Sequence, residues 1–188
     1  MTRFLLHGVL ATIIAILLAG CVAKKITNQI PERQGTKAYL KKDYSEAAAK
    51  YAEAAKNGNA NAKYALATMY MEGEGVDKDM DKTLLLLEQA CAQEQKDALL
   101  MLGLFYVYGD YVPTDAIKGA ALIYRAGVAR NDVAMYYMAH LYAAGVGVEK
   151  NLRRAQMWMN NAKEFGFPIK DELLTLKGLE ALYDNGPG

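Results

Sequence analysis

The chain has 188 residues, of which 53% are hydrophobic and 23% are charged, and it contains only two cysteines. Arg3 is the only charged residue among the first twenty, so the remaining 168 residues carry 21 basic and 21 acidic side chains. A formally neutral chain with interspersed charges argues against the basic surface that nucleic-acid binding requires. Two cysteines provide no disulfide framework, so a hydrophobic core must hold the fold.

Residues 1–20 have the pattern of an export signal. The basic Arg3 precedes an apolar run from Phe4 to Leu18, and small residues follow it. His7 and Gly8 interrupt the run, which leaves an apolar stretch that is short for a membrane-spanning helix. We therefore expect this segment to be cleaved and to play no part in the fold.

The residues that end this signal, Leu-Ala-Gly-Cys at 18–21, resemble the bacterial lipobox. The resemblance implies that the Cys21 thiol carries a diacylglycerol and that an acylated Cys21, with palmitate-type chains, becomes the first residue. The alternative is an ordinary signal followed by a chance cysteine. We predict a lipidated tether over residues 21–35, in which Lys24 and Lys25 aid membrane attachment only slightly. Val22 stands where an aspartate would resemble an inner-membrane retention signal, so we expect an outer-membrane anchor facing the periplasm, with surface display as the alternative.

An internal repeat of 36 residues dominates the rest of the chain. We predict a partial repeat at 36–59 and full repeats at 60–95, 96–131 and 132–167. The positions that keep their chemistry are Ala62, Ala98 and Ala134; Tyr70, Tyr106 and Tyr142; Gly73, Gly109 and Gly145; Val76, Val112 and Val148; and Asp79, Asp115 and Asn151.

Each repeat is expected to form two helices, A and B. Helix A has apolar residues at three- and four-residue spacing, as in Asn61–Met71, and a small residue such as Gly103 that permits close helix packing. A glycine such as Gly73 can end helix A in the left-handed conformation. Asp79 and its equivalents are good N-caps for helix B.

The strings AKYALATMYMEGEGV, ALLMLGLFYVYGDYV and AMYYMAHLYAAGVGV, which begin at residues 62, 98 and 134, resemble Sel-1-like repeats, relatives of the tetratricopeptide repeat. The resemblance covers residues 36–165 and implies an all-α, right-handed solenoid of helix-turn-helix repeats. The middle copy departs from the pattern at its turn, where Tyr111 replaces glycine. Residues 166–188 are expected to form a C-terminal capping helix and tail, with Pro168 in the first helical turn. The leucines that would cover the open end are Leu173, Leu174, Leu176, Leu179 and Leu182.

No catalytic, metal or cofactor site is predicted. His140 is the only histidine after the signal, and no serine or cysteine nucleophile forms a motif with it. Asp77, Asp79, Asp81 and Glu88 mimic a calcium loop, but Lys82 stands where that loop requires glycine. Cys91 and Trp158 are expected in the core, as are the repeat tyrosines.

A protein-binding face is predicted from the resemblance, because helix A lines the concave face in the tetratricopeptide architecture. The variation at one helix A position, which holds Thr68, Leu104 and His140, suits an asymmetric partner. The alternative is that solenoid curvature or the cap covers this stripe. The predicted lining is Tyr64, Thr68, Met71, Leu100, Leu104, Tyr108, Tyr136, His140 and Ala143.

The function expected from these observations is that of a membrane-anchored adaptor for an envelope assembly, such as a secretion, pilus or export complex. Its partners would be envelope proteins, with no small-molecule substrate evident. The alternative hypothesis is an immunity protein that occludes a toxic envelope-targeted effector such as a phospholipase. An enzyme of the cell wall or of lipids would require a polar constellation that the sequence does not contain.

Overall fold

The protein, as a computed structural model, is described over residues 29–170 and 175–183, and every regular element in these ranges is an α-helix. The chain divides into two compact units, one ending at Lys78 and the other beginning at Asp79. This boundary lies within the repeat expected at 60–95. The predicted signal, Cys21 and the tether lysines lie outside the described residues, as do Leu173 and Leu174. No helix in the described ranges is long and apolar enough to cross a membrane.

The first unit contains a helix over residues 29–40, α2 (Tyr44–Lys56) and α3 (Ala60–Glu72). The first helix extends into residues 29–35, which were expected to belong to the tether. These residues are helical because they pack against α2, a contact that the 36-residue repeat pattern did not predict. Gly35 lies directly on the ring of Tyr51, because a Cβ at Gly35 would come within 2.8 Å of its Cδ1. Pro31 and Ala38 of the same helix are also buried.

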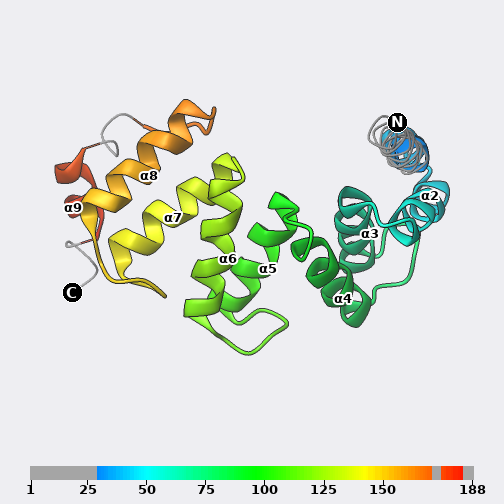
Figure 1. Ribbon diagram of the computed structural model, residues 1–188, viewed down its shortest axis with the longest axis horizontal. Coiled ribbons are helices and arrows are strands. Elements are labelled where there is room, and N and C mark those ends of the chain that lie inside the picture. Colours follow the sequence, from blue (N-terminus) through cyan, green and yellow to red (C-terminus); the bar gives the residue numbers. More distant parts are fainter. Residues whose placement is uncertain (1–28, 171–174, 184–188) are drawn as a thin grey trace, which may run out of the picture. The chain divides into compact units, whose positions relative to one another are not determined.

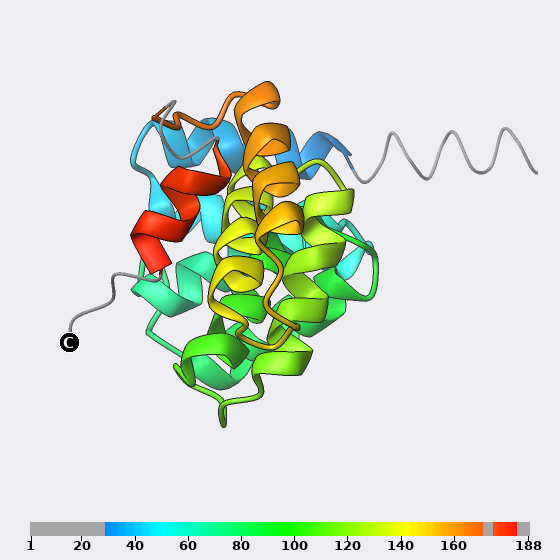
Figure 2. The same ribbon diagram turned by 90° about the vertical axis from the view of Figure 1, so that its left-hand side faces the viewer.

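The second unit consists of helical hairpins that stack side by side. It contains α4 (Met80–Cys91), α5 (Lys96–Tyr108), α6 (Ala116–Val128), α7 (Asp132–Ala144), α8 (Leu152–Glu164) and α9 (Leu176–Tyr183). Helices α5 and α6 pack as one hairpin and α7 and α8 as the next, while α6 joins the two by packing on α7 (Figure 1). In the turned view α8 lies nearer the viewer, with α7 and α6 behind it (Figure 2).

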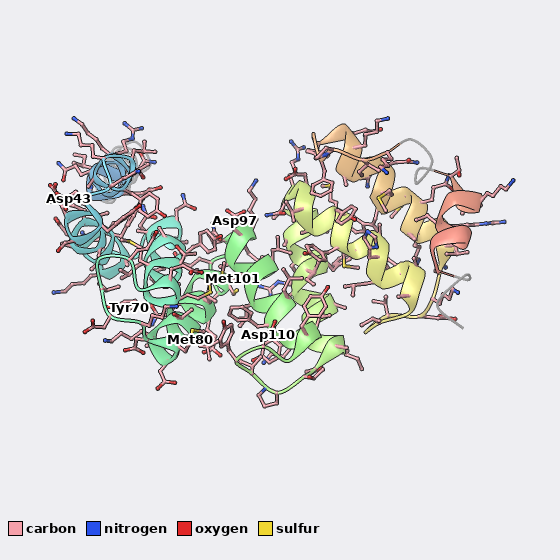
Figure 3. All side chains as sticks on the ribbon, turned by 180° about the vertical axis from the view of Figure 1, so that it is seen from behind. Asp43, Tyr70, Met80, Asp97, Met101 and Asp110 are labelled. Atoms are coloured by element: carbon pink, nitrogen blue, oxygen red, sulfur yellow. The ribbon has the colours of Figure 1, made fainter. Side chains whose placement is uncertain are left out.

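The helix ends follow the predicted punctuation. Gly73, Gly109 and Gly145 are the C-caps of α3, α5 and α7, with φ between 75° and 77°. Helix B begins each time at a side-chain cap. The oxygen of Asp43, Asp79, Asp115 or Asn151 accepts from the amide three residues later, and Figure 3 marks the first of these at the start of α2.

Small residues allow the hairpin helices of the second unit to approach closely. A Cβ at Gly103 of α5 would lie 2.6 Å from Cγ1 of Ile123 and 3.0 Å from the carbonyl oxygen of Gly119, both on α6. The close approach expected at position 103 is thus present, and it uses a second glycine on the facing helix.

The expected core residues are buried to different degrees. Cys91 and Trp158 are buried, and burial raises the pKa of the Cys91 thiol to about 11. Tyr142 is also buried, but Tyr106 is only half-buried. The Tyr106 hydroxyl accepts a hydrogen bond from Nζ of Lys118 at 2.6 Å. The repeat tyrosines therefore lie at the rim of the helical interface and not uniformly within the core.

The C-terminal cap begins later than predicted. Residues 166–170 are not helical, and α9 starts at Leu176, so Pro168 does not occupy a first helical turn. Gly166 has φ of 103°, and a proline disfavours helical backbone in the residue before it. Leu179 is fully buried, and α9 packs on α7 and α8, as expected of a cap on the last repeat.

Candidate functional site

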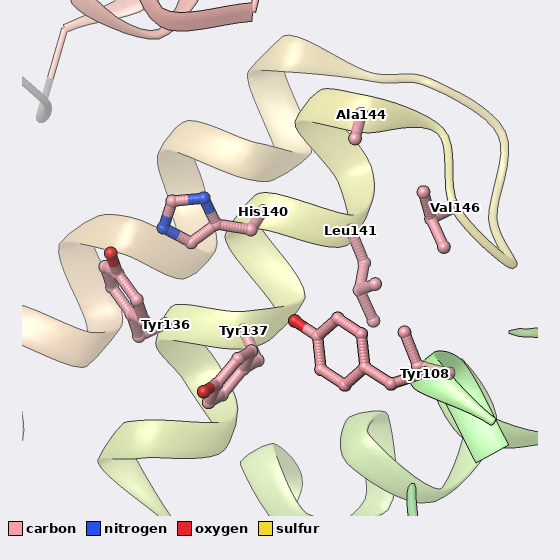
Figure 4. A pocket seen from close by; sticks show the side chains of 8 residues that line it. Tyr108, Tyr136, Tyr137, His140, Leu141, Ala144 and Val146 are labelled. Atoms are coloured by element: carbon pink, nitrogen blue, oxygen red, sulfur yellow. The ribbon is translucent and has the colours of Figure 1, made fainter. Parts of the chain in front are cut away.

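A pocket of about 440 Å³ lies between the helix A segments α5 and α7 of the second unit. Figure 4 shows Tyr108, at the end of α5, facing Tyr137 and Leu141 of α7 across the hollow. Its lining residues are Val107, Tyr108, Tyr136, Tyr137, His140, Leu141, Ala144 and Val146. The Tyr108 side chain is 63% exposed, so the pocket is open to a partner at this rim.

Aromatic contacts order one wall of the pocket. The rings of Tyr136 and His140 meet edge to face with centroids 4.3 Å apart, as expected for residues one helical turn apart. Phe167, in the segment after α8, stacks on Tyr136 with centroids 4.5 Å apart and planes 25° apart. The segment after the last repeat thus supports the wall from behind.

The protonation states of the pocket are set mainly by burial. Burial lowers the pKa of His140, so its imidazole is neutral at pH 7. Partial burial, and then the nearby Tyr137 and Asp110, raise the pKa of Tyr108. Among the described residues that line the pocket, none carries a carboxylate, ammonium or guanidinium group. It therefore offers apolar area with phenol and imidazole tips that can donate or accept hydrogen bonds, and it suits a neutral segment of a partner.

A polar bridge fixes how α5 and α7 lie against each other. Asn131, the N-cap of α7, is 4% exposed, and its Nδ2 donates to Oδ1 of Asp97 in the first turn of α5 at 2.8 Å. Nε2 of Gln95, the N-cap of α5, donates to the other oxygen of Asp97 at 3.0 Å. Because the pocket lies between these same helices, the bridge holds its walls in register.

The pocket unites three of the predicted partner-binding residues: Tyr108, Tyr136 and His140. Leu100 and Leu104 lie on α5 and are part-buried outside its lining. The predicted residues Tyr64, Thr68 and Met71 lie on α3 of the first unit and are all part-exposed. The inclusion of Ala143 was wrong, because this residue is fully buried.

Sequence reasoning missed Val107, Tyr137, Leu141, Ala144 and Val146. It followed one residue in each helical turn, whereas the pocket is lined by adjacent pairs such as Tyr136 and Tyr137. Tyr137 could have been found from the repeat, since its equivalents are Ala65 and Met101 and the position varies in size. Val146 lies in the turn after α7, to which no binding role had been assigned.

The chemistry available in the pocket is that of binding. The described lining residues include no serine or cysteine beside His140. Within residues 29–170 and 175–183, no group of three or more His, Cys, Asp or Glu side chains could hold a metal ion. Asp79, part of the apparent calcium loop, caps α4 by accepting from the Lys82 amide at 2.9 Å.

The Sel1 repeat family matches residues 33–59, 60–94, 96–127 and 132–164, which is more than half of the chain. The chain belongs to the Sel1 repeat family. Sel1 repeat proteins act as scaffolds for protein–protein interactions, and their families are generally non-catalytic. The all-helical solenoid class predicted from the sequence is thus confirmed.

Two solved structures share the fold. A Sel1 repeat protein from Oxalobacter formigenes is 29% identical, with a TM-score of 0.62, over 65% of this chain and 36% of its own. A protective antigen present in uropathogenic Escherichia coli strains, displaying an SLR fold, is 26% identical, with a TM-score of 0.69, over 74% of this chain and 31% of its own. The chain thus spans about a third of the length of either structure.

A curated relative from Rhizobium leguminosarum bv. viciae is named an exopolysaccharide production negative regulator. It is 26% identical to this chain, and the alignment covers 94% of this chain and 78% of the relative. The similarity therefore extends beyond a single repeat.

Proposed function

We propose that this protein is a lipid-anchored adaptor of the bacterial envelope, which binds another protein through the pocket between α5 and α7. The observation that carries the proposal is the composition of the pocket. Three tyrosines and a neutral histidine surround apolar side chains, and tyrosine is among the residues that contribute most to protein interfaces. An apolar or aromatic side chain of the partner would fill the hollow, while the phenol groups would bond its backbone.

The lipid anchor is the second part of the proposal. It rests on the Leu-Ala-Gly-Cys sequence ending at Cys21 and on the export signal before it. Attachment at this cysteine would hold the repeats near the membrane, and Val22 favours the outer membrane, facing the periplasm. The 168 residues after the signal carry 21 basic and 21 acidic side chains, so no net charge draws them to an anionic membrane, and the lipid would supply most of the attachment.

We propose further that binding regulates its partner, and that the partner belongs to a machine that makes or exports a polysaccharide. The name of the Rhizobium relative supports this direction. It favours a regulatory adaptor over the alternative of an immunity protein, which would instead require a toxic effector as the bound protein. Repeat scaffolds serve many partners on one fold, so the partner must be identified by experiment.

Quantitative co-purification of the lipidated protein from solubilised envelopes tests the proposal. Tyr108→Ala should reduce recovery of the partner at least tenfold, because truncating an interface aromatic commonly costs about 2 kcal/mol or more. Val128→Ala is the matched control, since Val128 is 62% exposed on α6 and lies outside the pocket. If the wild type and Tyr108→Ala recover equal amounts of the partner, the binding site lies outside this pocket.

The anchor is tested separately by the variant Cys21→Ser. We expect loss of the acyl mass and release of the protein from carbonate-washed membranes. A Cys21→Ser protein that stays in the washed membrane would contradict the lipid anchor without bearing on the pocket.

A further inference from the structure

One face of the helix over residues 29–40 combines basic and apolar side chains that are exposed. Arg33, Lys37 and Lys41 follow one another at four-residue spacing, and the Lys41 amide still donates to the carbonyl of Lys37, so the helical turn continues to this residue. Ile30 and Leu40 fall on the same side of the helix and are 52% and 78% exposed. Figure 3 shows nitrogen-tipped side chains projecting outward from this helix.

A hollow of about 350 Å³ extends this basic face onto α2. It is lined by Gln34, Lys37, Ala38 and Lys41 of the first helix region and by Glu46 and Lys50 of α2. Three lysines thus face a single glutamate, which leaves the hollow positively charged.

Carboxylates of this chain neutralise the lysines of this face only slightly, which leaves their positive charge available to an outside partner. Among the described residues, neither Lys37 nor Lys41 lies within ion-pair distance of a carboxylate, and Lys50 has one loose contact, 3.6 Å from Glu53. Glu32, the acidic residue within the same helix, is engaged elsewhere, because its carboxylate accepts from Nδ2 of Asn59 at 2.6 Å. The opposite side of the helix packs into the first unit, so the basic face is the one directed outward.

We propose that this face of the first unit docks on the surface of an anionic phospholipid bilayer. The inference rests on the lipid anchor proposed above, because Cys21 lies only eight residues before the helix begins at residue 29. Eight residues span at most about 28 Å even when fully extended, so the anchor keeps the face close to the headgroups. Lysines attract phosphate groups, while exposed Ile30 and Leu40 can enter the interfacial region, a combination typical of helices that lie on membranes.

The apolar rim decides between a bilayer and other anions. A soluble phosphate or an acidic polymer would use the lysines but would gain nothing from Leu40, whose side chain is largely in solvent. Docking would orient the first unit relative to the membrane, which attachment at Cys21 does not do by itself.

Vesicle co-sedimentation tests the proposal on the mature chain carrying Cys21→Ser, so that lipid plays no part in the result. The expected outcome is salt-sensitive binding to vesicles of phosphatidylcholine with phosphatidylglycerol and weak binding to phosphatidylcholine alone. Each basic residue near an anionic surface contributes a factor of about five to partitioning. The triple variant Lys37→Gln, Lys41→Gln, Lys50→Gln should therefore bind at least tenfold more weakly.

Two further variants complete the test. The control Lys56→Gln, Lys170→Gln, Lys177→Gln removes the same charge at exposed positions outside the face and should bind as the parent does. Leu40→Ser should weaken binding severalfold at every salt concentration. Equal loss in the two triple variants, or no preference for phosphatidylglycerol, would overturn the docking face. Because the assay omits the lipid, its failure is distinguishable from failure of acylation, which the acyl mass reports.

Discussion

The ring of Tyr111 packs edge to face on the ring of Phe105, with centroids 5.0 Å apart, although the backbone of Tyr111 is left-handed with φ of 65°. The equivalent turn residues in the neighbouring copies are Gly75 and Gly147, with φ of 70° and 67°. The repeat therefore imposes the same backbone on a residue that favours it much less than glycine does. In this middle turn, the place of the glycine is taken by a tyrosine whose ring makes an aromatic contact.

Replacing Tyr111 by glycine and by alanine should separate strain from ring packing. Both variants lose the aromatic contact, worth about 0.5 to 1.5 kcal/mol, but only glycine relieves the strained backbone, worth about 1 kcal/mol. Tyr111→Gly should therefore be more stable than Tyr111→Ala by about 1 kcal/mol, as measured by urea unfolding. Equal midpoints for the two variants would show that the turn is not left-handed in solution.

Gly127 should be required only as long as Trp158 faces it. A Cβ at Gly127 would lie 2.8 Å from Cζ3 of Trp158, an atom that phenylalanine lacks. Gly127→Ala should destabilise the protein by about 1 to 3 kcal/mol through overpacking. In a Trp158→Phe background the same change should be neutral or stabilising, because alanine is the better helix former. A double-mutant cycle in urea that gives no coupling would contradict this contact.

The repeat frame predicted the parts of the fold that depend on local chemistry. Gly73 and Asp79 act through their own backbone and nearest amides, so one sequence reveals both caps. Two of the left-handed residues that end helix B were not predicted. Glu94 and Arg130 occupy equivalent positions with φ of 57° and 63°, and neither is a residue type that signals such a turn.

The candidate site was only partly predictable, because its walls depend on contacts between distant residues. The bridge from Asp97 to Asn131 spans 34 residues and leaves no local pattern. Phe167, which supports Tyr136, lies in the connection after the last repeat, to which no role in the site had been assigned. The resemblance to tetratricopeptide repeats predicted helix A as the binding element, but only the placement of α5 beside α7 in the folded chain selects the residues that line the pocket.

The buried Cys91 thiol should make stability fall at alkaline pH. Its pKa is raised to about 11 in the folded protein, so the unfolded chain loses this proton first as the pH rises. The stability contributed by the neutral thiol is complete below pH 9 and is lost between about pH 9 and pH 11. The difference in unfolding free energy between wild type and Cys91→Ala should therefore shrink across this window. A constant difference would show that the thiol is accessible to solvent in the folded state.

The pKa of the His140 imidazole should lie below its usual value of about 6.5, because burial disfavours the charged form. Since the folded pKa is lowered, the stability due to neutral His140 is present above pH 6.5 and is lost as the pH falls through the folded pKa. His140→Leu, which introduces the residue of the middle repeat, should reduce this acid sensitivity. The protein without residues 1–20 contains one histidine, so nuclear magnetic resonance follows the titration of His140 alone. A midpoint at or above 6.5 would contradict the burial of the ring.

Leu104 should matter for partner capture more than for folding. Leu104 is part-buried on α5, outside the pocket lining, but its equivalent on α7, His140, does line the pocket, so we expect a partner seated there to extend over Leu104. Leu104→Glu should change stability by about 1 kcal/mol or less, since glutamate is a good helix former. Partner recovery should fall at least tenfold, because a carboxylate would be buried in the complex without a mate.

The matched control for this change is Ile117→Glu, an equal exchange at a side chain that is 75% exposed on α6. Circular dichroism and co-purification on the same samples separate folding from binding. If Leu104→Glu unfolds the protein, Leu104 belongs to the core. If it folds and still captures the partner while Ile117→Glu does not, the binding surface lies on α6, because a carboxylate disrupts only the face that the partner covers.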